Sequence, residues 1–222
     1  MMKATLLLAL LTLPQDPGVT VEKDVDYLGP DRKEKMDLYL PAGEAPPKGF
    51  PAVLMIHGGG WSGGDKGAAR EQNIGTTLAK NGYVAASINY QLAAKKPTFL
   101  QTLAEVWPRN LHDCKIGVRF LRKNAAKYRI DHDHIGVLGG SAGGHLAALV
   151  AMTSPEDGLD PKEPWGEVSC RVQAAMPMYG VHDFAAFAKE PPPAELTELL
   201  KRGSPVTYAT KDDPPALILH GT

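Results

Sequence analysis

The chain of 222 residues has few cysteines, no excess charge of either sign and no long apolar run. Its two cysteines, Cys114 and Cys170, are too few for a disulfide framework or a four-ligand zinc site. We expect two buried free thiols, since a bridge between them would require an oxidising compartment. With 24 Lys and Arg against 25 Asp and Glu, no basic field favours a nucleic-acid partner. No stretch reaches membrane-spanning length, so an integral membrane protein is not expected.

The first residues carry a separate signal. Lys3 precedes an apolar run over residues 4–13, which has the charge and length of the first two regions of a secretory leader. A small-x-small cleavage pattern is absent before Pro14. The prediction is a leader over residues 1–18 of a secreted or periplasmic protein, followed by one domain over residues 19–222. A buried strand or arm in a cytoplasmic protein is the alternative.

The domain itself has the pattern of an α/β fold. Residues 19–27 and 36–40 alternate apolar and polar side chains, which predicts an antiparallel hairpin. Buried strands are predicted at 52–56, 83–88 and 135–138, further strands at 172–178 and 216–219, and helices at 68–80, 111–128, 142–152 and 194–202. This alternation predicts a mostly parallel sheet with helices on both faces. Ligands in such sheets bind beyond the carboxyl ends of the strands.

A glycine-rich turn follows the strand predicted at 135–138. Gly139, Ser141 and Gly143 have the spacing of a nucleophile elbow, in which a sharp turn leaves the serine oxygen exposed. The amide of Ala142 would lie at a helix N-terminus, where free N–H groups favour developing negative charge. Such a motif alone is weak evidence for a catalytic serine, but here it stands between a buried strand and a helix, as a nucleophile elbow does.

A second glycine cluster, His-Gly-Gly-Gly-Trp at 57–61, follows another buried strand. Its amides without side chains, at residues 58–60, would supply the further donors that an oxyanion needs. A phosphate-binding loop is excluded because Gly64 stands where that motif requires a lysine. Trp61 would either line a substrate pocket or pack inside the protein.

These two motifs, the helical segment 113–122 and the Leu-Ile-Leu-His-Gly-Thr segment at 217–222 resemble the esterase and lipase group of α/β-hydrolases. The resemblance is closest to the BD-FAE branch, the feruloyl and acetyl-xylan esterase-like enzymes, and extends over residues 21–222. It implies an α/β-hydrolase fold and a serine esterase with Ser141 as nucleophile. The implied oxyanion donors are Gly59, Gly60 and Ala142, with Trp61 as a further candidate. Departures at Gln91, where we expect an arginine, and at residues 176–178 affect substrate preference.

Several functions fit this resemblance. The leading hypothesis is hydrolysis of short acyl esters, such as acetyl or feruloyl groups on carbohydrate, without a metal or other cofactor. An arylformamidase or a lipase-like esterase of small molecules would use the same serine. A catalytically inactive hydrolase fold that acts as a binding module is the alternative from another class. The sequence does not indicate an oligomeric state.

The triad acid and histidine have no convincing candidates within the sequence. In this fold both follow the nucleophile, the acid after the strand that ends near His220. Asp212 and Asp213 precede that strand and should lie about 20 Å from its carboxyl end, where the active site is expected. We therefore expect the acid and the histidine beyond residue 222, together with a last strand and helix. Residues 1–222 alone should then be poorly soluble and without turnover.

The internal histidines have other interpretations. His145 is expected to be a packed or hydrogen-bonded helix residue. His132 and His134 precede their strand at its inactive end and are expected in a solvated turn. His182 lies at the correct edge, but its acid Asp183 is adjacent in sequence, and no acid follows His220 to orient it.

Overall fold

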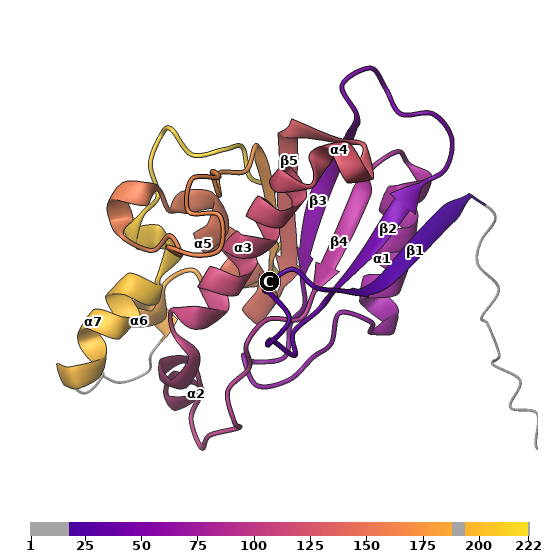
Figure 1. Cartoon of the computed structure of the whole chain (residues 1–222). Helices are drawn as coiled ribbons and strands as arrows, with labels where there is room; N and C mark the ends of the chain where they lie inside the picture. Colours follow the sequence, from indigo (N-terminus) through magenta and orange to yellow (C-terminus); the bar gives the residue numbers. More distant parts are fainter. Residues whose placement is uncertain (1–17, 188–193, 222) are drawn as a thin grey trace, which may run out of the picture.

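A six-stranded sheet forms the centre of the protein, in the order β1-β2-β4-β3-β5-β6 (Figure 1). The structure is a computed structural model that describes residues 18–187 and 194–221, so the predicted leader lies almost entirely outside the described residues. The strands are β1 (Val19–Val25), β2 (Met36–Pro41), β3 (Phe50–Ile56), β4 (Val84–Ile88), β5 (Ile130–Gly140) and β6 (Ala174–Met178). Strands β4, β3, β5 and β6 are parallel neighbours, whereas β2 is antiparallel to both β1 and β4. The predicted hairpin and mostly parallel sheet are confirmed.

The helices connect these strands and cover both faces of the sheet (Figure 1). They are α1 (Ala69–Lys80), α2 (Phe99–Val106), α3 (Arg109–Lys123), α4 (Ala125–Tyr128), α5 (Ala142–Met152), α6 (Phe184–Phe187) and α7 (Ala194–Gly203), with short 3-10 turns η1 (Pro155–Asp157) and η2 (Pro205–Thr207). No helix among the described residues is long and apolar enough to cross a membrane.

The sheet lies between two apolar clusters, one on each of its faces. Because successive side chains of a strand point to opposite faces, Leu54 and Ile56 join the larger cluster and Met55 joins the smaller one. The larger cluster contains the buried faces of α3 and α5, such as Leu121 and Leu146. The smaller cluster packs beneath α1. Both faces of the central strands are therefore buried, as their continuous apolar runs predict.

Several elements differ from the sequence-based prediction, among them helix α6, which was not predicted. The helix predicted at 111–128 is interrupted at Asn124, which ends α3 and precedes α4. Helix α2 was not predicted, although Thr98 and Gln101 form a capping box at its start. The strand predicted at 135–138 begins at Ile130, so the predicted turn around His132 and His134 is wrong, although both side chains are exposed.

The segment 216–219 lies beside β6 and extends the sheet. Leu217 N–H donates to the carbonyl of Ala175 at 2.9 Å, and Tyr179 N–H donates to the carbonyl of Leu219 at 2.6 Å. Parallel bridges join Ala216 and Leu219 to β6 without forming a full strand. Leu217 is 58% exposed, so this segment presents apolar side chains to solvent.

The two cysteines are both buried and free, as predicted. Burial raises the pKa of Cys114 well above its ordinary value and that of Cys170 to about 11. Both side chains are therefore neutral thiols near pH 7, which are poor nucleophiles.

Candidate active site

Ser141 occupies the tight turn between β5 and α5. Its backbone has φ 56° and ψ −121°, a strained conformation for a residue with a side chain. The turn is fixed by two backbone hydrogen bonds, from Ser141 N–H to the carbonyl of Met178 at 2.9 Å and from His145 N–H to the carbonyl of Ser141 at 3.0 Å. Ser141 is exposed, and its hydroxyl has no hydrogen-bond partner in the described part of the chain. The geometry is that of an elbow that presents the serine oxygen to solvent.

The glycines around Ser141 allow two backbones to meet. A Cβ atom at Gly143 would lie 2.1 Å from the carbonyl oxygen of Ile56, and one at Gly139 would lie 2.3 Å from the carbonyl oxygen of Gly143. A Cβ at Gly58 would lie 2.8 Å from the carbonyl oxygen of Gly140. Side chains at these positions would separate the elbow from the end of β3, so glycine is required by close approach.

The loop after β3 faces the elbow across this contact. Gly59 and Gly60 are exposed and have φ values of +120° and +59°, which glycine adopts without strain. Their N–H groups do not donate to any group of residues 18–187 or 194–221. The N–H of Ala142 lies in the first turn of α5, where amides lack helical partners. The structure thus brings Gly59, Gly60, Ala142 and Ser141 to the same edge of the sheet.

Trp61 packs inside the protein. Its indole is 4% exposed and donates from Nε1 to Nδ1 of His145 at 3.3 Å. Its ring also lies 5.9 Å from that of Phe184. Of the two alternatives from the sequence, the structure therefore supports packing, and the buried indole does not form a pocket wall.

His145 is a fully buried helix residue, which confirms the prediction. Its Nδ1 accepts from Trp61, so its Nε2 carries the hydrogen and donates to the carbonyl of Gly203 at 2.7 Å. Burial lowers the pKa of His145 to about 4. Both ring nitrogens are occupied, so this imidazole is not free to accept the proton of Ser141.

This buried imidazole should make stability depend on pH. An unfolded histidine has a pKa near 6.5, whereas folded His145 stays neutral down to about pH 4, so protonation favours the unfolded chain in that window. At about 1.4 kcal/mol per pH unit, His145 should remove about 2 kcal/mol from the free energy of unfolding between pH 7 and pH 5. His145→Gln replaces the imidazole with an amide that can also accept and donate but does not titrate, so it should lack this loss, as urea titrations of the two proteins would measure. Equal losses in the two proteins would contradict the assignment.

His57 is a buried residue at the start of the glycine loop that follows β3. It is 2% exposed, its ring stacks on that of Tyr90 at 4.5 Å, and its Nδ1 lies 2.7 Å from the carbonyl oxygen of Gly58. The hydroxyl of Tyr90 donates to the carbonyl of His57 at 2.9 Å. Burial lowers the pKa of His57, so the ring is neutral near pH 7. No sequence motif indicates this role of Tyr90, which lies 33 positions away from His57.

The other histidines and acids do not form a catalytic pair among the described residues. Asp183 accepts from the N–H groups of Ala185 and Ala186 at 2.9 and 3.1 Å, so it caps α6 and is not bonded to His182. His220 is exposed. Asp212 lies before Pro215, which pairs with the first residues of β6, so it is at the edge opposite Ser141, as predicted.

His132 and His134, in the first half of β5, each pair with one aspartate. His132 pairs with Asp133 at 3.0 Å, and His134 pairs with Asp131 at 2.8 Å. Within residues 18–187 and 194–221, no group of three or more histidine, cysteine or acidic side chains is placed to hold a metal ion.

Gln91 stands where the resemblance led us to expect an arginine. Its N–H donates to Asp113 at 2.8 Å. Arg32 makes two hydrogen bonds to the same carboxylate, at 2.8 and 3.2 Å. The cationic partner of this buried carboxylate is therefore Arg32, from the loop between β1 and β2.

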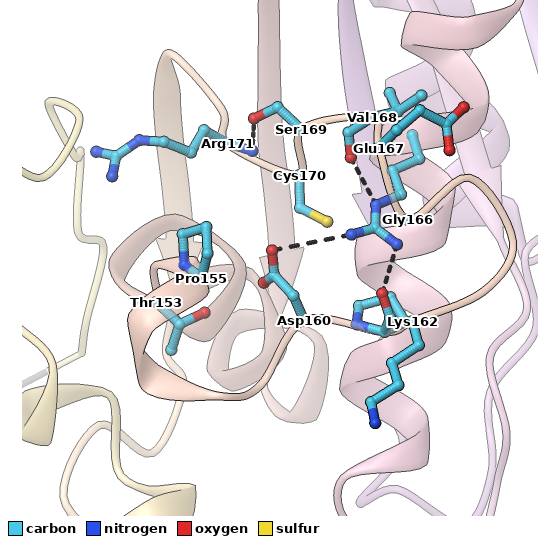
Figure 2. A pocket seen from close by; sticks show the side chains of 12 residues that line it. Thr153, Pro155, Asp160, Lys162, Gly166, Glu167, Val168, Ser169, Cys170 and Arg171 are labelled. Carbon is cyan, nitrogen blue, oxygen red and sulfur yellow. Dashed lines mark hydrogen bonds and ion pairs between the residues drawn. The ribbon is translucent and has the colours of Figure 1, made fainter.

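A pocket of about 490 Å³ lies at the opposite edge of the sheet (Figure 2). Asp160, Cys170 and Arg171 are among the residues that line it. Buried Arg119 holds its walls together by donating to the carbonyls of Pro161 and Val168 at 2.6 and 2.7 Å. The pocket contains neither Ser141 nor any candidate oxyanion donor, so it is separate from the candidate active site.

The sheet order, the crossover helices and the strained serine at a strand end define an α/β-hydrolase fold. The family model of BD-FAE matches residues 36–222, so the chain belongs to the BD-FAE family.

Individual relatives agree with this assignment. The esterase LipQ of Mycobacterium tuberculosis is 29% identical over 231 residues, which cover 96% of this chain and 52% of LipQ. The chain thus spans about half the length of that relative. A truncated carbohydrate esterase from gut microbiota has a TM-score of 0.79 and 27% identity, over 94% of this chain and 79% of that one. Esterase 2 of Thermogutta terrifontis, phosphorylated by paraoxon, has a TM-score of 0.69 and 26% identity, over 92% of this chain and 71% of that one.

Proposed function

We propose that the protein is a serine carboxylic ester hydrolase that forms an acyl intermediate on Ser141. The observation that carries this proposal is the strained, exposed serine at the end of β5, opposite the glycine loop after β3. Strain of this kind persists only where the surrounding structure holds it, and it is concentrated at functional sites. The names of LipQ and of the carbohydrate esterase give independent support.

The reaction follows from these groups. The oxygen of Ser141 attacks the ester carbonyl, the alcohol leaves with a proton, and water then releases the acid and restores the serine. The N–H groups of Gly59, Gly60 and Ala142 stabilise the oxyanion of the tetrahedral intermediates, and loss of one such donor costs about 3 kcal/mol. His145 and His57 serve as supports for the elbow and the loop, because both are buried and neutral.

The substrates in this proposal are short acyl esters, with acetyl or feruloyl groups on carbohydrate as the preferred class. Support comes from the family assignment and from the carbohydrate esterase among the similar structures. A secreted or periplasmic location would fit such substrates, and Lys3 with the apolar run at 4–13 supports it.

Ester hydrolysis by the full-length protein tests the proposal. We expect turnover of p-nitrophenyl acetate and of acetylated xylan, and slower turnover of p-nitrophenyl esters with long acyl chains. Because acyl transfer through a serine requires no Lewis acid, EDTA should leave the rate unchanged. A large loss with EDTA that zinc restores would contradict the serine mechanism, and the absence of turnover with every ester would contradict the esterase assignment.

A further inference from the structure

Arg70 and Tyr179 meet directly beside the candidate nucleophile. Arg70 lies in the first turn of α1, and Tyr179 follows the last residue of β6. The Nη1 of Arg70 and the hydroxyl oxygen of Tyr179 are 2.6 Å apart. A Cβ atom at Gly140 would lie 2.3 Å from that nitrogen and 2.6 Å from that oxygen. The pair therefore covers the backbone of the residue that precedes Ser141.

The charge of Arg70 is already balanced. Its Nε lies 3.0 Å from a carboxylate oxygen of Glu71, which is 4% exposed. A guanidinium held by a buried carboxylate has little remaining attraction for an anionic ligand. The pair is therefore better suited to a neutral ligand that offers oxygen atoms as acceptors.

The hydroxyl of Tyr179 has a hydrogen left to donate. A guanidinium group can only donate, so the hydroxyl oxygen accepts the hydrogen from Arg70 and its own hydrogen points elsewhere. No group among the described residues accepts it. Tyr179 is 48% exposed, so about half of this residue is accessible to a ligand.

The backbone at Tyr179 is also held in an unusual conformation. Its φ is +42°, which costs free energy for a residue with a side chain. Its N–H donates to the carbonyl of Leu219 at 2.6 Å, and this bond fixes the residue at the end of β6. The position of the ring over Gly140 is thus determined by the sheet.

We propose that Tyr179, oriented by Arg70, binds the alcohol part of the ester when that alcohol is a sugar. The phenol hydrogen is donated to a sugar hydroxyl next to the ester oxygen, and the exposed ring packs against the C–H face of the sugar. Arg70 is a positioning residue that holds the phenol. This assignment rests on the proposed function, since it concerns the same site.

In the full-length protein, an ester of a sugar and an ester without a sugar distinguish sugar binding by Tyr179 from a general role in catalysis. Tyr179→Phe removes the hydroxyl and should lower kcat/KM for an acetylated xylo-oligosaccharide about tenfold, mainly through KM. The p-nitrophenyl group of p-nitrophenyl acetate carries no sugar hydroxyl groups that Tyr179 could bind. The change in kcat/KM for this substrate should therefore stay within twofold. Arg70→Gln should produce the same selective loss, and the double variant should lose little more, because the two residues act as a unit. Tyr83→Phe, at an exposed tyrosine before β4, should change neither substrate.

Binding provides a readout that needs no turnover. In the Ser141→Ala protein, calorimetry should give a Kd for the acetylated xylo-oligosaccharide that rises about tenfold when Tyr179→Phe is added. An unchanged Kd, or equal kinetic losses with both substrates, would overturn the sugar-binding role. Serine-dependent turnover of p-nitrophenyl acetate without sugar binding would overturn this role and leave the proposed esterase intact. The proposed function fails only if no ester is hydrolysed through Ser141.

Discussion

Replacing Ser141 with alanine should lower kcat for p-nitrophenyl acetate by about 10⁶-fold in the full-length protein, as for other serine nucleophiles that act through a triad. The alanine should be well accommodated, because the elbow is fixed by backbone hydrogen bonds at Ser141 and by the glycines on either side. Urea denaturation should therefore show little change in stability, and steady-state kinetics would measure the loss of activity.

Ser169→Ala is the matched control for this loss. Ser169 is an exposed serine near the pocket at the opposite edge of the sheet, so its replacement should leave kcat unchanged. If Ser141→Ala retained more than a small fraction of wild-type activity while Ser169→Ala lost it, another serine would be the nucleophile.

Gly59→Ala should produce the next largest loss, about 10²–10³-fold in kcat. A Cβ at Gly59 would lie 2.2 Å from the carbonyl oxygen of Gly63, and the φ of +120° is strained for alanine. The loop must shift to relieve this contact, which moves the N–H groups of Gly59 and Gly60 away from the position of the oxyanion. Because the groups lost act mainly in the transition state, kcat should fall and KM should change little.

Gly63→Ala tests whether the loss comes from this contact. Gly63 lies on the same loop, has no positive φ, and its added Cβ would approach nothing closer than 3.7 Å. Its replacement should keep activity near the wild-type value. Full activity in Gly59→Ala would mean that the loop does not supply the oxyanion donors.

Features encoded by neighbouring residues could be predicted from the sequence. The elbow needs glycine at positions 139 and 143 because the end of β3 approaches its backbone, and that requirement is visible as a spacing in the chain. The buried strands are visible as continuous apolar runs, because both of their faces are covered. Helix α5 was predicted with its observed bounds, since it starts directly at the elbow.

Features that depend on distant residues could not be predicted. The packing of Trp61 is decided by His145, which lies 84 positions away, so the sequence alone left a pocket wall and a buried side chain as alternatives. Arg70 and Tyr179 are 109 positions apart and meet only because α1 begins, and β6 ends, at the same edge of the sheet. Neither residue belongs to a motif, and their pairing has no local signal.

The most direct test of the account is the site of a covalent adduct. After incubation of the full-length protein with paraoxon, peptide mass spectrometry should find the phosphoryl group on Ser141, with loss of esterase activity in proportion to the modified fraction. The paraoxon-phosphorylated esterase of Thermogutta terrifontis shows that a similar fold accepts this reagent. A stable adduct on a different residue, or ester turnover that persists with Ser141 fully modified, would contradict the assignment of Ser141 as the nucleophile.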